Sequence, residues 1–211
     1  MTEKQTTSKW TGMKGKIMAW FCNSPLRTLI EVRLLGLPRT AFLSEVSNSI
    51  HSNEVILDVG AGSGYFSLAI AKMLSTGKVI CLDLSEEMLN RLERKAEKEG
   101  IKDKIQILKR GASSSGLKDE SVDLVVSNFA LHEFSSPETV LMEMIRVLKP
   151  NGRVIITDLL SNSWLGKMEV VSADAHGPYS VDELKAFFTK YGLKDVKVSS
   201  IKYWLIGMGK K

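Results

Sequence analysis

Hydrophobic and polar positions follow two different periods along residues 54–211. Short runs rich in β-branched residues predict strands, and stretches with an apolar residue every three or four positions predict helices. The expected strands are 55–59, 78–83, 105–109, 122–127, 153–158, 196–200 and 203–208. The expected helices are 65–74, 86–99, 137–148 and 181–191. This alternation predicts βαβ units on a parallel sheet, and the last two strands, joined by a short connection, should pair antiparallel.

Residues with special backbone preferences mark the predicted helix ends. Ser136 precedes Pro137, which predicts an N-cap followed by proline at the first helical position. The turn at 150–152, Pro-Asn-Gly, is expected to end that helix and lead into the strand 153–158. Ser180 with Glu183 three positions later predicts a capping box at the start of the last helix.

The first 52 residues have a different pattern. Apolar residues recur at helical spacing at Trp10, Met13, Ile17, Trp20 and Phe21, and 26–35 and 41–50 are expected to form two further helices. The segment is too short to enclose a core of its own. We therefore predict an N-terminal helical extension, residues 1–52, attached to one α/β domain, residues 53–211.

A glycine-rich turn follows the first strand. Gly60, Gly62 and Gly64 have the spacing GxGxG, whereas the dinucleotide fingerprint GxGxxG would need a third glycine where Tyr65 stands. Asp58 precedes the turn inside an apolar strand, and a buried carboxylate is costly unless it is hydrogen-bonded or faces a positive charge. A pyrophosphate would repel this acid. The ammonium group of S-adenosylmethionine, which carries no phosphate, would satisfy it.

A second acid, Asp83, ends the second strand, where a carboxylate can bind both hydroxyls of a ribose. NAD enzymes use an acid at the same place, so Asp83 alone does not discriminate between the two cofactors. The combination of Asp58, the GxGxG turn and Asp83 favours S-adenosylmethionine.

Residues 53–159 resemble the class I S-adenosylmethionine-dependent methyltransferases, in particular the type 11 group related to ubiquinone- and menaquinone-biosynthesis methyltransferases. The motifs that carry the resemblance are VILDVGAGSGYFSLAIA, VICLDLSEEML, LKDESVDLVVSNFALHEF and VLKPNGRVIITDL. The resemblance implies a doubly wound seven-stranded, mainly parallel sheet of order 3-2-1-4-5-7-6, with strand 7 antiparallel. It also implies S-adenosylmethionine as cofactor and S-adenosylhomocysteine as product. It is specific for fold and cofactor, and not for the methyl acceptor.

Carried over position by position, the resemblance implies roles at the cofactor. Gly60, Ala61 and Gly62 would lie under its methionine part, and Asp83 would hold its ribose. Leu84 and Met88 would lie beside the adenine, with Asn128 and Phe129 facing the methionyl and methyl region. The complete set of expected cofactor-binding residues is Asp58, Gly60, Ala61, Gly62, Gly64, Asp83, Leu84, Met88, Gly111, Ala112, Asn128 and Phe129.

The third predicted strand is followed by a departure from the family pattern. Relatives usually have an acid after the glycine, and it contacts the adenine amino group. In this chain Gly111 is followed by Ala112 and then by three serines, 113–115. A backbone carbonyl or a serine would have to replace that contact, or the cofactor would bind more weakly. One neutral hydrogen bond contributes about 0.5–1.5 kcal/mol, so this loss alone would not abolish binding.

Methyl transfer from a sulfonium is an in-line displacement that depends mainly on positioning, and a general base is needed only when the acceptor must lose a proton. The predicted catalytic residues are His132, after the fourth strand, and His176 and Tyr179, after the fifth. The alternatives are a structural role for the ring of His132 and an ordinary turn around His176. Glu133 is expected to face solvent or cap the next turn.

A short loop limits the acceptor pocket, because only 21 residues separate Asp158 from Ser180. The N-terminal helices and this loop are therefore expected to close the pocket. Trp10, Trp20, Phe21 and Trp164 either line it or pack as core, and the second alternative is favoured for any one of them.

Composition adds limits on location and partners. The 211 residues are 44% hydrophobic and 25% charged, which is typical of soluble globular proteins. No window of 18 uncharged apolar residues and no secretory signal is found, and Cys22 and Cys81 lie in apolar contexts without a CxxC pair. We therefore expect a reduced, cytoplasmic protein without a metal site. The net charge of +5 is spread out, which favours a solvated surface over an anionic ligand, lipid or RNA partner.

The leading hypothesis is an enzyme that methylates a small organic acceptor, such as a quinone-like, phenolic or thiol compound. An RNA- or protein-directed methyltransferase is the first alternative, although the exit of the fourth strand, residues 127–130, reads SNFA and lacks the N/D-PP-Y/F motif of many amino-directed enzymes. A non-catalytic scaffold is the second alternative, and the retained Asp58, glycine turn and Asp83 argue against it. Nucleic-acid binding and peripheral membrane contact are disfavoured. The acceptor atom, the pathway and the oligomeric state are not determined by the sequence.

Overall fold

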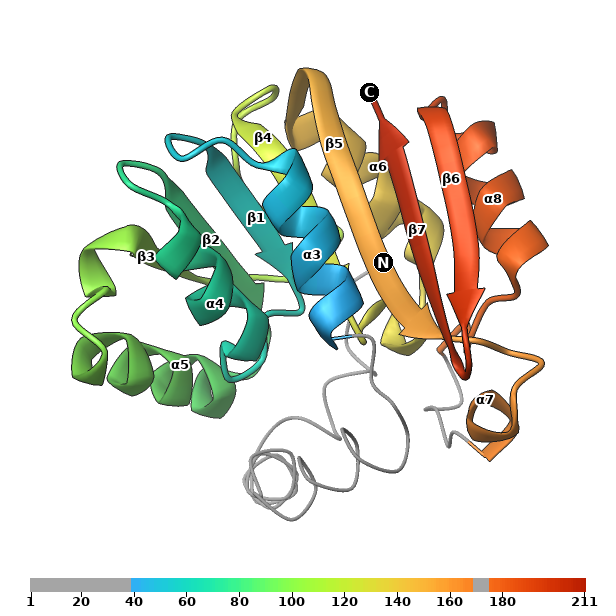
Figure 1. Ribbon diagram of the computed structural model, residues 1–211, viewed down its shortest axis with the longest axis horizontal. Helices are drawn as coiled ribbons and strands as arrows, with labels where there is room; N and C mark the ends of the chain where they lie inside the picture. The colour runs from blue at the N-terminus through green and yellow to red at the C-terminus, as the bar shows by residue number, and fades with distance from the viewer. Residues whose placement is uncertain (1–38, 169–174) are drawn as a thin grey trace.

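The computed structural model describes residues 39–168 and 175–211 (Figure 1). The helices predicted within residues 1–38, together with Trp10, Trp20, Phe21 and Cys22, lie outside the described residues.

One sheet of seven strands forms the centre of the fold, in the order β3-β2-β1-β4-β5-β7-β6 (Figure 1). Its strands are β1 (Val55–Val59), β2 (Lys78–Asp83), β3 (Ile105–Lys109), β4 (Val122–Asn128), β5 (Leu148–Leu159), β6 (Lys194–Ile201) and β7 (Trp204–Lys210). Strands β1 to β5 pair parallel, and β7 pairs antiparallel with both β5 and β6. The predicted strand order and the antiparallel seventh strand are confirmed.

Helices cover both faces of the sheet (Figure 1). The helical segments are α3 (Arg39–Ser49), α4 (Tyr65–Met73), α5 (Glu86–Lys98), η2 (Lys102–Lys104), η3 (Leu131–Glu133), α6 (Pro137–Val147), α7 (Trp164–Met168) and α8 (Val181–Lys190). Helices α3, α4 and α5 pack on one face and α6 and α8 on the other. Within residues 39–168 and 175–211, no helix combines the length and apolar character needed to cross a membrane.

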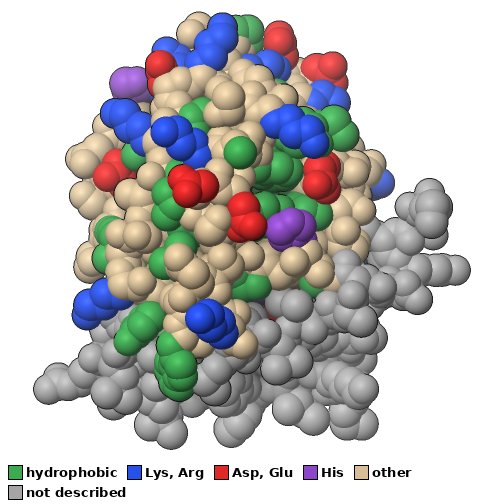
Figure 2. Space-filling view, turned by 90° about the vertical axis from the view of Figure 1, so that its right-hand side faces the viewer, with side chains coloured by type: hydrophobic (Ala, Val, Ile, Leu, Met, Phe, Trp, Pro, Cys, Tyr) green, Lys and Arg blue, Asp and Glu red, His purple; other side chains and the backbone are tan. Residues whose placement is uncertain are grey.

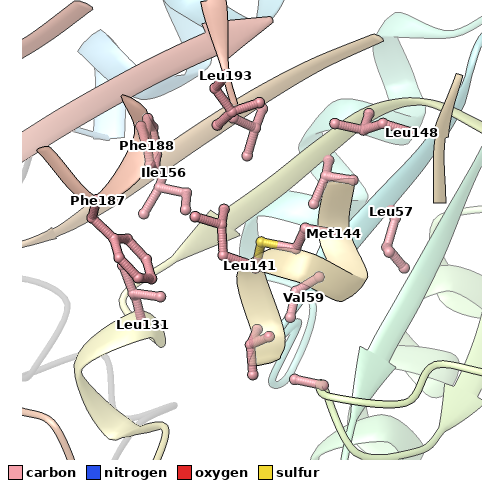
Figure 3. Packing of buried hydrophobic residues seen from close by; sticks show 14 of the residues in the cluster. Leu57, Val59, Leu131, Leu141, Met144, Leu148, Ile156, Phe187, Phe188 and Leu193 are labelled. Carbon is pink, nitrogen blue, oxygen red and sulfur yellow. The ribbon is translucent and has the colours of Figure 1, made fainter. Parts of the chain in front are cut away.

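Two apolar layers hold the helices to the sheet. Under α6 and α8, Leu141, Met144 and Phe188 interlock with residues of β1, β4 and β5 (Figure 3). On the opposite face, Phe42 of α3 and Leu92 of α5 are fully buried against the sheet. Because α3 contributes to this core, the last helix of the predicted extension packs directly on the domain.

The start of β5 differs from the prediction. The strand begins at Leu148, directly after α6, and not at Arg153. Leu148 is fully buried and pairs with Val122, and the register then shifts before Arg153 pairs with Leu124. Asn151 has a φ of 64°, a left-handed conformation that asparagine tolerates well. The turn at 150–152 is therefore an irregularity within the β4–β5 pairing.

The two predicted N-caps behave differently. Ser136 occupies the position before α6 and Pro137 the first helical position, but the Ser136 side chain makes no capping hydrogen bond. At α8, Glu183 N donates to Ser180 Oγ at 3.2 Å and Ser180 N donates to the Glu183 carboxylate at 2.7 Å. The predicted capping box is confirmed.

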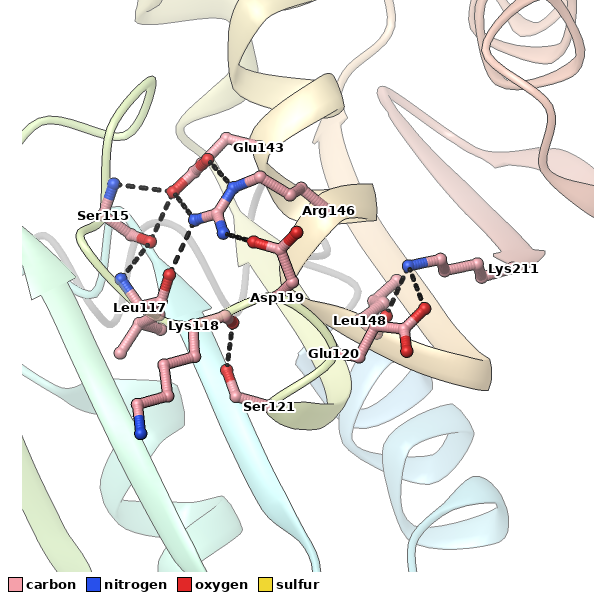
Figure 4. A network of polar contacts seen from close by, with 10 residues as sticks. All are labelled: Ser115, Leu117, Lys118, Asp119, Glu120, Ser121, Glu143, Arg146, Leu148 and Lys211. Atoms are coloured by element: carbon pink, nitrogen blue, oxygen red, sulfur yellow. Dashed lines mark hydrogen bonds and ion pairs between the residues drawn. The ribbon is translucent and has the colours of Figure 1, made fainter.

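Residues 110–121 connect β3 to β4 without a helix, and a polar network holds this crossover on α6 (Figure 4). Ser115 donates from its backbone N at 2.8 Å and from Oγ at 2.5 Å to one carboxylate oxygen of Glu143. Arg146 donates from Nε to the other oxygen at 2.7 Å and from Nη2 to Leu117 O at 2.8 Å, and it also pairs with Asp119. The network thus holds residues 115–119 of the crossover against α6.

Candidate active site

The carboxyl ends of β1, β2 and β4 meet at one edge of the sheet, and the glycine turn lies there. Gly60, Gly62 and Gly64 have φ angles of 75°, 53° and 80°, which favour glycine. The backbone N atoms of Gly60 and Ala61 donate to Leu82 O of β2 at 2.9 and 3.1 Å. A Cβ on Gly60 would lie 2.5 Å from the Cβ of Ala130, so the turn and the exit of β4 approach closely only because residue 60 is glycine.

Asp83 connects the end of β2 to this turn. Its Oδ2 accepts a hydrogen bond from Gly62 N at 2.8 Å, and its Oδ1 accepts one from Ser85 N at 2.8 Å. Burial raises the pKa of Asp83, and these backbone hydrogen bonds oppose the increase. A Cβ on Gly62 would meet no atom of the described residues within 4 Å, so this part of the chain leaves space beside the turn. The geometry brings Asp83 and the turn together, as cofactor binding at this edge requires.

Asp58 is a buried acid without a cationic partner among the described residues. Its side chain is 3% exposed, and Oδ2 accepts a hydrogen bond from Ser67 Oγ of α4 at 2.5 Å. Burial raises its pKa to about 7, the Ser67 hydrogen bond opposes this effect, and the charge of Asp83 adds to it. A ligand that brings a positive charge to this position would satisfy the carboxylate.

The remaining residues expected at the adenine lie at the same edge. Leu84 is half-buried and Met88 is buried in the first turn of α5. Ala112 is buried in the core layer under α6. Of the three serines after it, Ser115 is bonded to Glu143, and which group replaces the missing acid, a backbone carbonyl or another serine, stays a prediction.

Asn128 and Phe129 lie where β4 leaves the sheet. Asn128 is the last residue of the strand and not, as predicted, the first beyond it, and its Nδ2 donates to Thr157 Oγ1 of β5. Phe129 has a φ of 60°, and its backbone N donates to Thr157 O at 2.9 Å. Its ring centroid lies 4.8 Å from that of Trp204 and 5.3 Å from that of His132. An aromatic cluster therefore borders the region expected to hold the transferable methyl group.

His132 lies between two carboxylates in η3. Its Nδ1 is 2.5 Å from Asp158 Oδ1, its backbone N donates to Asp158 Oδ2 at 2.9 Å, and its Nε2 is 3.6 Å from Glu133 Oε1. Burial by itself lowers the pKa of His132, but the charges and hydrogen bonds of Asp158 and Glu133 raise it to about 10. The two carboxylates thus favour the cationic form of the ring. The Glu133 side chain is only 16% exposed, so of the two predicted alternatives, facing solvent or capping the next turn, the first is wrong and the second stays a prediction.

The loop before α8 packs against η3. His176 N donates to Phe134 O at 3.1 Å, and Gly177 N donates to His132 O at 3.1 Å. The exposed ring of His176 stacks on Tyr179 with centroids 4.1 Å apart and planes at 6°. Tyr179 is 3% exposed, burial raises the pKa of its hydroxyl, and this hydroxyl has no hydrogen-bond partner among the described residues. The backbone contacts bring the three predicted catalytic positions into one region, and their catalytic roles stay predictions.

Several residues of the site were not predicted from the sequence. Asp158 could have been found by the argument used for Asp83, because both acids lie at the carboxyl end of a strand. Ser67 and Trp204 gave no signal, since each reaches the site through tertiary packing. Lys95 of α5 donates from Nζ to Ser63 O at 3.1 Å and supports the glycine turn.

Trp164 is 61% exposed, so the interpretation that it packs as core is wrong for this residue.

The fold and site together define a class of protein. A sheet of this order, a GxGxG turn after β1, and acids at Asp58 and Asp83 are the features of an S-adenosylmethionine-dependent methyltransferase. The residues that the structure describes fit that cofactor: they bring no cation to Asp58, Asp83 lies beside the turn, and they leave the space at Gly62 open.

Comparison with known proteins gives the family. The chain belongs to the methyltransferase domain family, whose model matches residues 50–190. A S-adenosylmethionine-dependent methyltransferase from Aquifex aeolicus has a similar structure, with a TM-score of 0.74, 25% identity, and coverage of 92% of this chain and 97% of that one.

Two curated relatives match a shorter stretch. Demethylmenaquinone methyltransferase of Bacteroides fragilis is 33% identical over 104 residues, 49% of this chain and 42% of the relative. The ubiquinone/menaquinone biosynthesis C-methyltransferase UbiE of Escherichia fergusonii is 27% identical over 112 residues, 53% of this chain and 45% of the relative. The chain therefore spans less than half the length of these two relatives.

Proposed function

We propose that this methyltransferase transfers the methyl group of S-adenosylmethionine to a small, planar, largely apolar acceptor of the quinol or phenol type. The observation that carries the proposal is the aromatic cluster at the exit of β4, in which Phe129 lies between Trp204 and His132. Flat aromatic surfaces with few polar groups favour planar apolar ligands.

On the cofactor side, the turn at Gly60–Gly64 would approach the methionine part of S-adenosylmethionine along bare backbone. Asp83 would accept hydrogen bonds from the ribose hydroxyls, and Asp58 would face the ammonium group. Leu84 and Met88 would contact the adenine. When bound, the cofactor supplies a methyl group on a sulfonium, which is already a good leaving group. The task of the chain is therefore to hold and orient the reactants, which can contribute roughly 7–11 kcal/mol.

On the acceptor side, the half-buried ring of Phe129, backed by the buried ring of Trp204, would provide one apolar wall. His132 is a positioning residue in this account, because an imidazolium held by Asp158 has no free lone pair with which to take a proton. His176 and Tyr179 would border the entrance, since their loop is bonded to η3. The names of the curated relatives, which describe methylation in menaquinone and ubiquinone synthesis, support an acceptor of the quinol type.

The alternatives have less support. On the face that carries β6 and α8, basic and acidic side chains are interspersed (Figure 2). A nucleic-acid-binding surface would gather basic residues, so this face gives that alternative no support. The scaffold alternative does not explain why an acid is buried at Asp58 or why the described residues leave space at Gly62.

The test is a methylation assay on the full chain. Labelled S-adenosylmethionine is supplied with a 1,4-naphthohydroquinone unsubstituted at C2, a catechol, a small thiol, bulk RNA or bulk protein, and products are identified by mass. We expect label in the hydroquinone or the catechol. Label confined to RNA or protein would overturn the small-molecule proposal.

Two matched variants on the β6–β7 hairpin separate the acceptor site from the cofactor site. Trp204→Phe removes part of the aromatic wall and should raise the acceptor KM several-fold, with the S-adenosylhomocysteine Kd nearly unchanged. Tyr203→Phe removes one hydroxyl from the neighbouring residue and should change neither constant. An unchanged acceptor KM in Trp204→Phe would remove the aromatic cluster from the acceptor site.

A further inference from the structure

Asp58 is hydrogen-bonded to a neutral group, and no described residue compensates the charge of its carboxylate. Its Oδ2 accepts a hydrogen bond from Ser67 Oγ at 2.5 Å, and Ser67 is fully buried in α4. The neighbouring strands add no positive charge, because β2 presents Cys81 and Asp83, and β4 presents Val126 at the paired position. In the described part of the chain, no lysine, arginine or histidine contacts Asp58. A buried carboxylate in such surroundings is neutralised either by a proton or by an incoming cation.

We propose that Asp58 carries a proton in the free protein near neutral pH, that the α-ammonium group of the cofactor displaces this proton, and that Ser67 is the positioning residue for the exchange. The inference rests on the proposed function, since it requires the cofactor to lie along the glycine turn. In the exchange the O–H bond of Asp58 breaks, its proton passes to solvent, and the carboxylate left behind pairs with the ammonium group. One proton is released for each cofactor bound.

Ser67 suits this role because a hydroxyl can serve both protonation states. It donates to a carboxylate, and it accepts a hydrogen bond from a carboxylic acid. Its bond to Oδ2 keeps the Asp58 side chain in one orientation, and among the described residues Oδ1 accepts no hydrogen bond. Ser67 belongs to the first turn of α4, which directly follows the glycine turn, so the two parts of the site are fixed together.

The pH dependence follows from the sign of the change in Asp58. Burial raises the pKa of Asp58 to about 7 in the free protein, and an ammonium group beside it would lower the pKa again. Binding should therefore release a proton at pH values below about 7 and release almost none above about pH 8.5. By linkage, cofactor affinity should fall by up to about tenfold per pH unit below pH 7.

Calorimetry of the full chain measures the proton directly. S-adenosylhomocysteine is titrated at about pH 6 and about pH 8.5, each in two buffers that differ in ionisation enthalpy. This ligand keeps the ammonium group and lacks the sulfonium charge. We expect release approaching one proton at the lower pH and near zero at the higher. 5′-Methylthioadenosine, which lacks the ammonium group, should bind without proton release at either pH.

Three variants assign the proton to its group. Asp58→Asn should bind S-adenosylhomocysteine without proton release. Its affinity should be the same at all pH values and should resemble the affinity that the wild type has at low pH. Ser67→Ala removes a hydrogen bond that lowers the pKa of Asp58, so the midpoint of proton release should move to higher pH. Ser127→Ala is the matched control: Ser127 is equally buried and donates to Val59 O at 2.9 Å, and its loss should leave the midpoint unchanged.

The outcomes separate this inference from the proposed function. If S-adenosylhomocysteine binds with no proton release and the same affinity at both pH values, the exchange is wrong and the cofactor site stands. If the ligand does not bind at any pH, the proposed function itself fails. If circular dichroism shows that Asp58→Asn does not fold, the test becomes the pH midpoint of proton release in Ser67→Ala compared with that in Ser127→Ala. Equal midpoints would overturn the role of Ser67.

Discussion

The carboxylate of Asp158, at the end of β5, accepts two hydrogen bonds from His132. The backbone N of His132 donates at 2.9 Å, and its ring Nδ1 donates at 2.5 Å. Both groups are almost fully buried. The pair fastens η3 to β5, and η3 in turn bonds to the loop that carries His176. This buried pair thus connects the region that we propose for the acceptor to the sheet.

Asp158→Asn should therefore destabilise the fold, by about 3–5 kcal/mol, because it leaves His132 without its charged partner. The pKa of His132 is raised from its usual 6.5 to about 10, so the stability from its charge is complete below pH 6.5 and is lost as the pH rises through about 10. The difference between wild type and variant, measured by urea unfolding, should shrink over that window. A difference independent of pH would mean that His132 is neutral in the folded protein.

Gly62 and Gly64 should respond differently to alanine. A Cβ on Gly64 would lie 2.4 Å from Leu92, so Gly64→Ala should lose about 1–3 kcal/mol of stability through overpacking. A Cβ on Gly62 meets no atom within 4 Å among residues 39–168 and 175–211, and Gly62→Ala should cost only the left-handed strain of about 1 kcal/mol while strongly weakening S-adenosylhomocysteine binding. Thermal unfolding and calorimetry on both variants check this. Unchanged affinity in Gly62→Ala would mean that the ligand lies elsewhere.

Asp58→Asn should stabilise the free protein at alkaline pH. The folded-state pKa of Asp58 is raised from 3.8 to about 7. Because of this, the free energy of unfolding is not reduced by Asp58 below pH 3.8, and it decreases as the pH rises from there through about 7. Asparagine stays neutral, so at about pH 8 the variant should gain up to about 4 kcal/mol, and the gain should shrink toward pH 5. Urea unfolding at both pH values measures it, with the exposed Glu97→Gln as control. An equal effect at both pH values would contradict a buried neutral acid.

Glu143→Gln should loosen the crossover between β3 and β4. Glu143 accepts two hydrogen bonds from Ser115 and pairs with Arg146, and hydrogen bonds to charged groups contribute about 1.5–3 kcal/mol each. Hydrogen exchange at the amides of Ser115 and Leu117 should accelerate more than exchange in β1. Uniform acceleration across the sheet would indicate a global effect in place of a local one.

The fold was predictable because its signals are local. The glycine spacing, the β-branched runs and the Ser180–Glu183 capping box each act within a few residues, and all appear as expected. The start of β5 was not predicted because it depends on the pairing of Leu148 with Val122. These two residues are separated in the sequence by the whole of α6. A turn sequence such as Pro-Asn-Gly can lie inside a strand pairing when buried neighbours fix the register.

The cofactor side was more predictable than the acceptor side for a related reason. Asp58, Asp83 and the glycine turn lie on two consecutive βα units, so their proximity follows from the topology of the sheet. The His132–Asp158 pair and the Phe129–Trp204 contact join residues 26 or more positions apart. Which of those side chains meet depends on packing in three dimensions, and the sequence carries no pattern for it.

The central claim is that the turn after β1 and Asp83 hold S-adenosylmethionine. It is tested most directly by calorimetric titration of the full chain with S-adenosylmethionine, S-adenosylhomocysteine and NAD, repeated on Asp83→Ala. Asp123→Ala is the control, because Asp123 also accepts a strand backbone hydrogen bond, from Val55 N at 2.9 Å, at the opposite edge of the sheet. We predict that both adenosyl ligands bind, that NAD does not, and that only Asp83→Ala weakens binding, by about tenfold or more. Wild-type affinity in Asp83→Ala, or tight binding of NAD, would contradict the account.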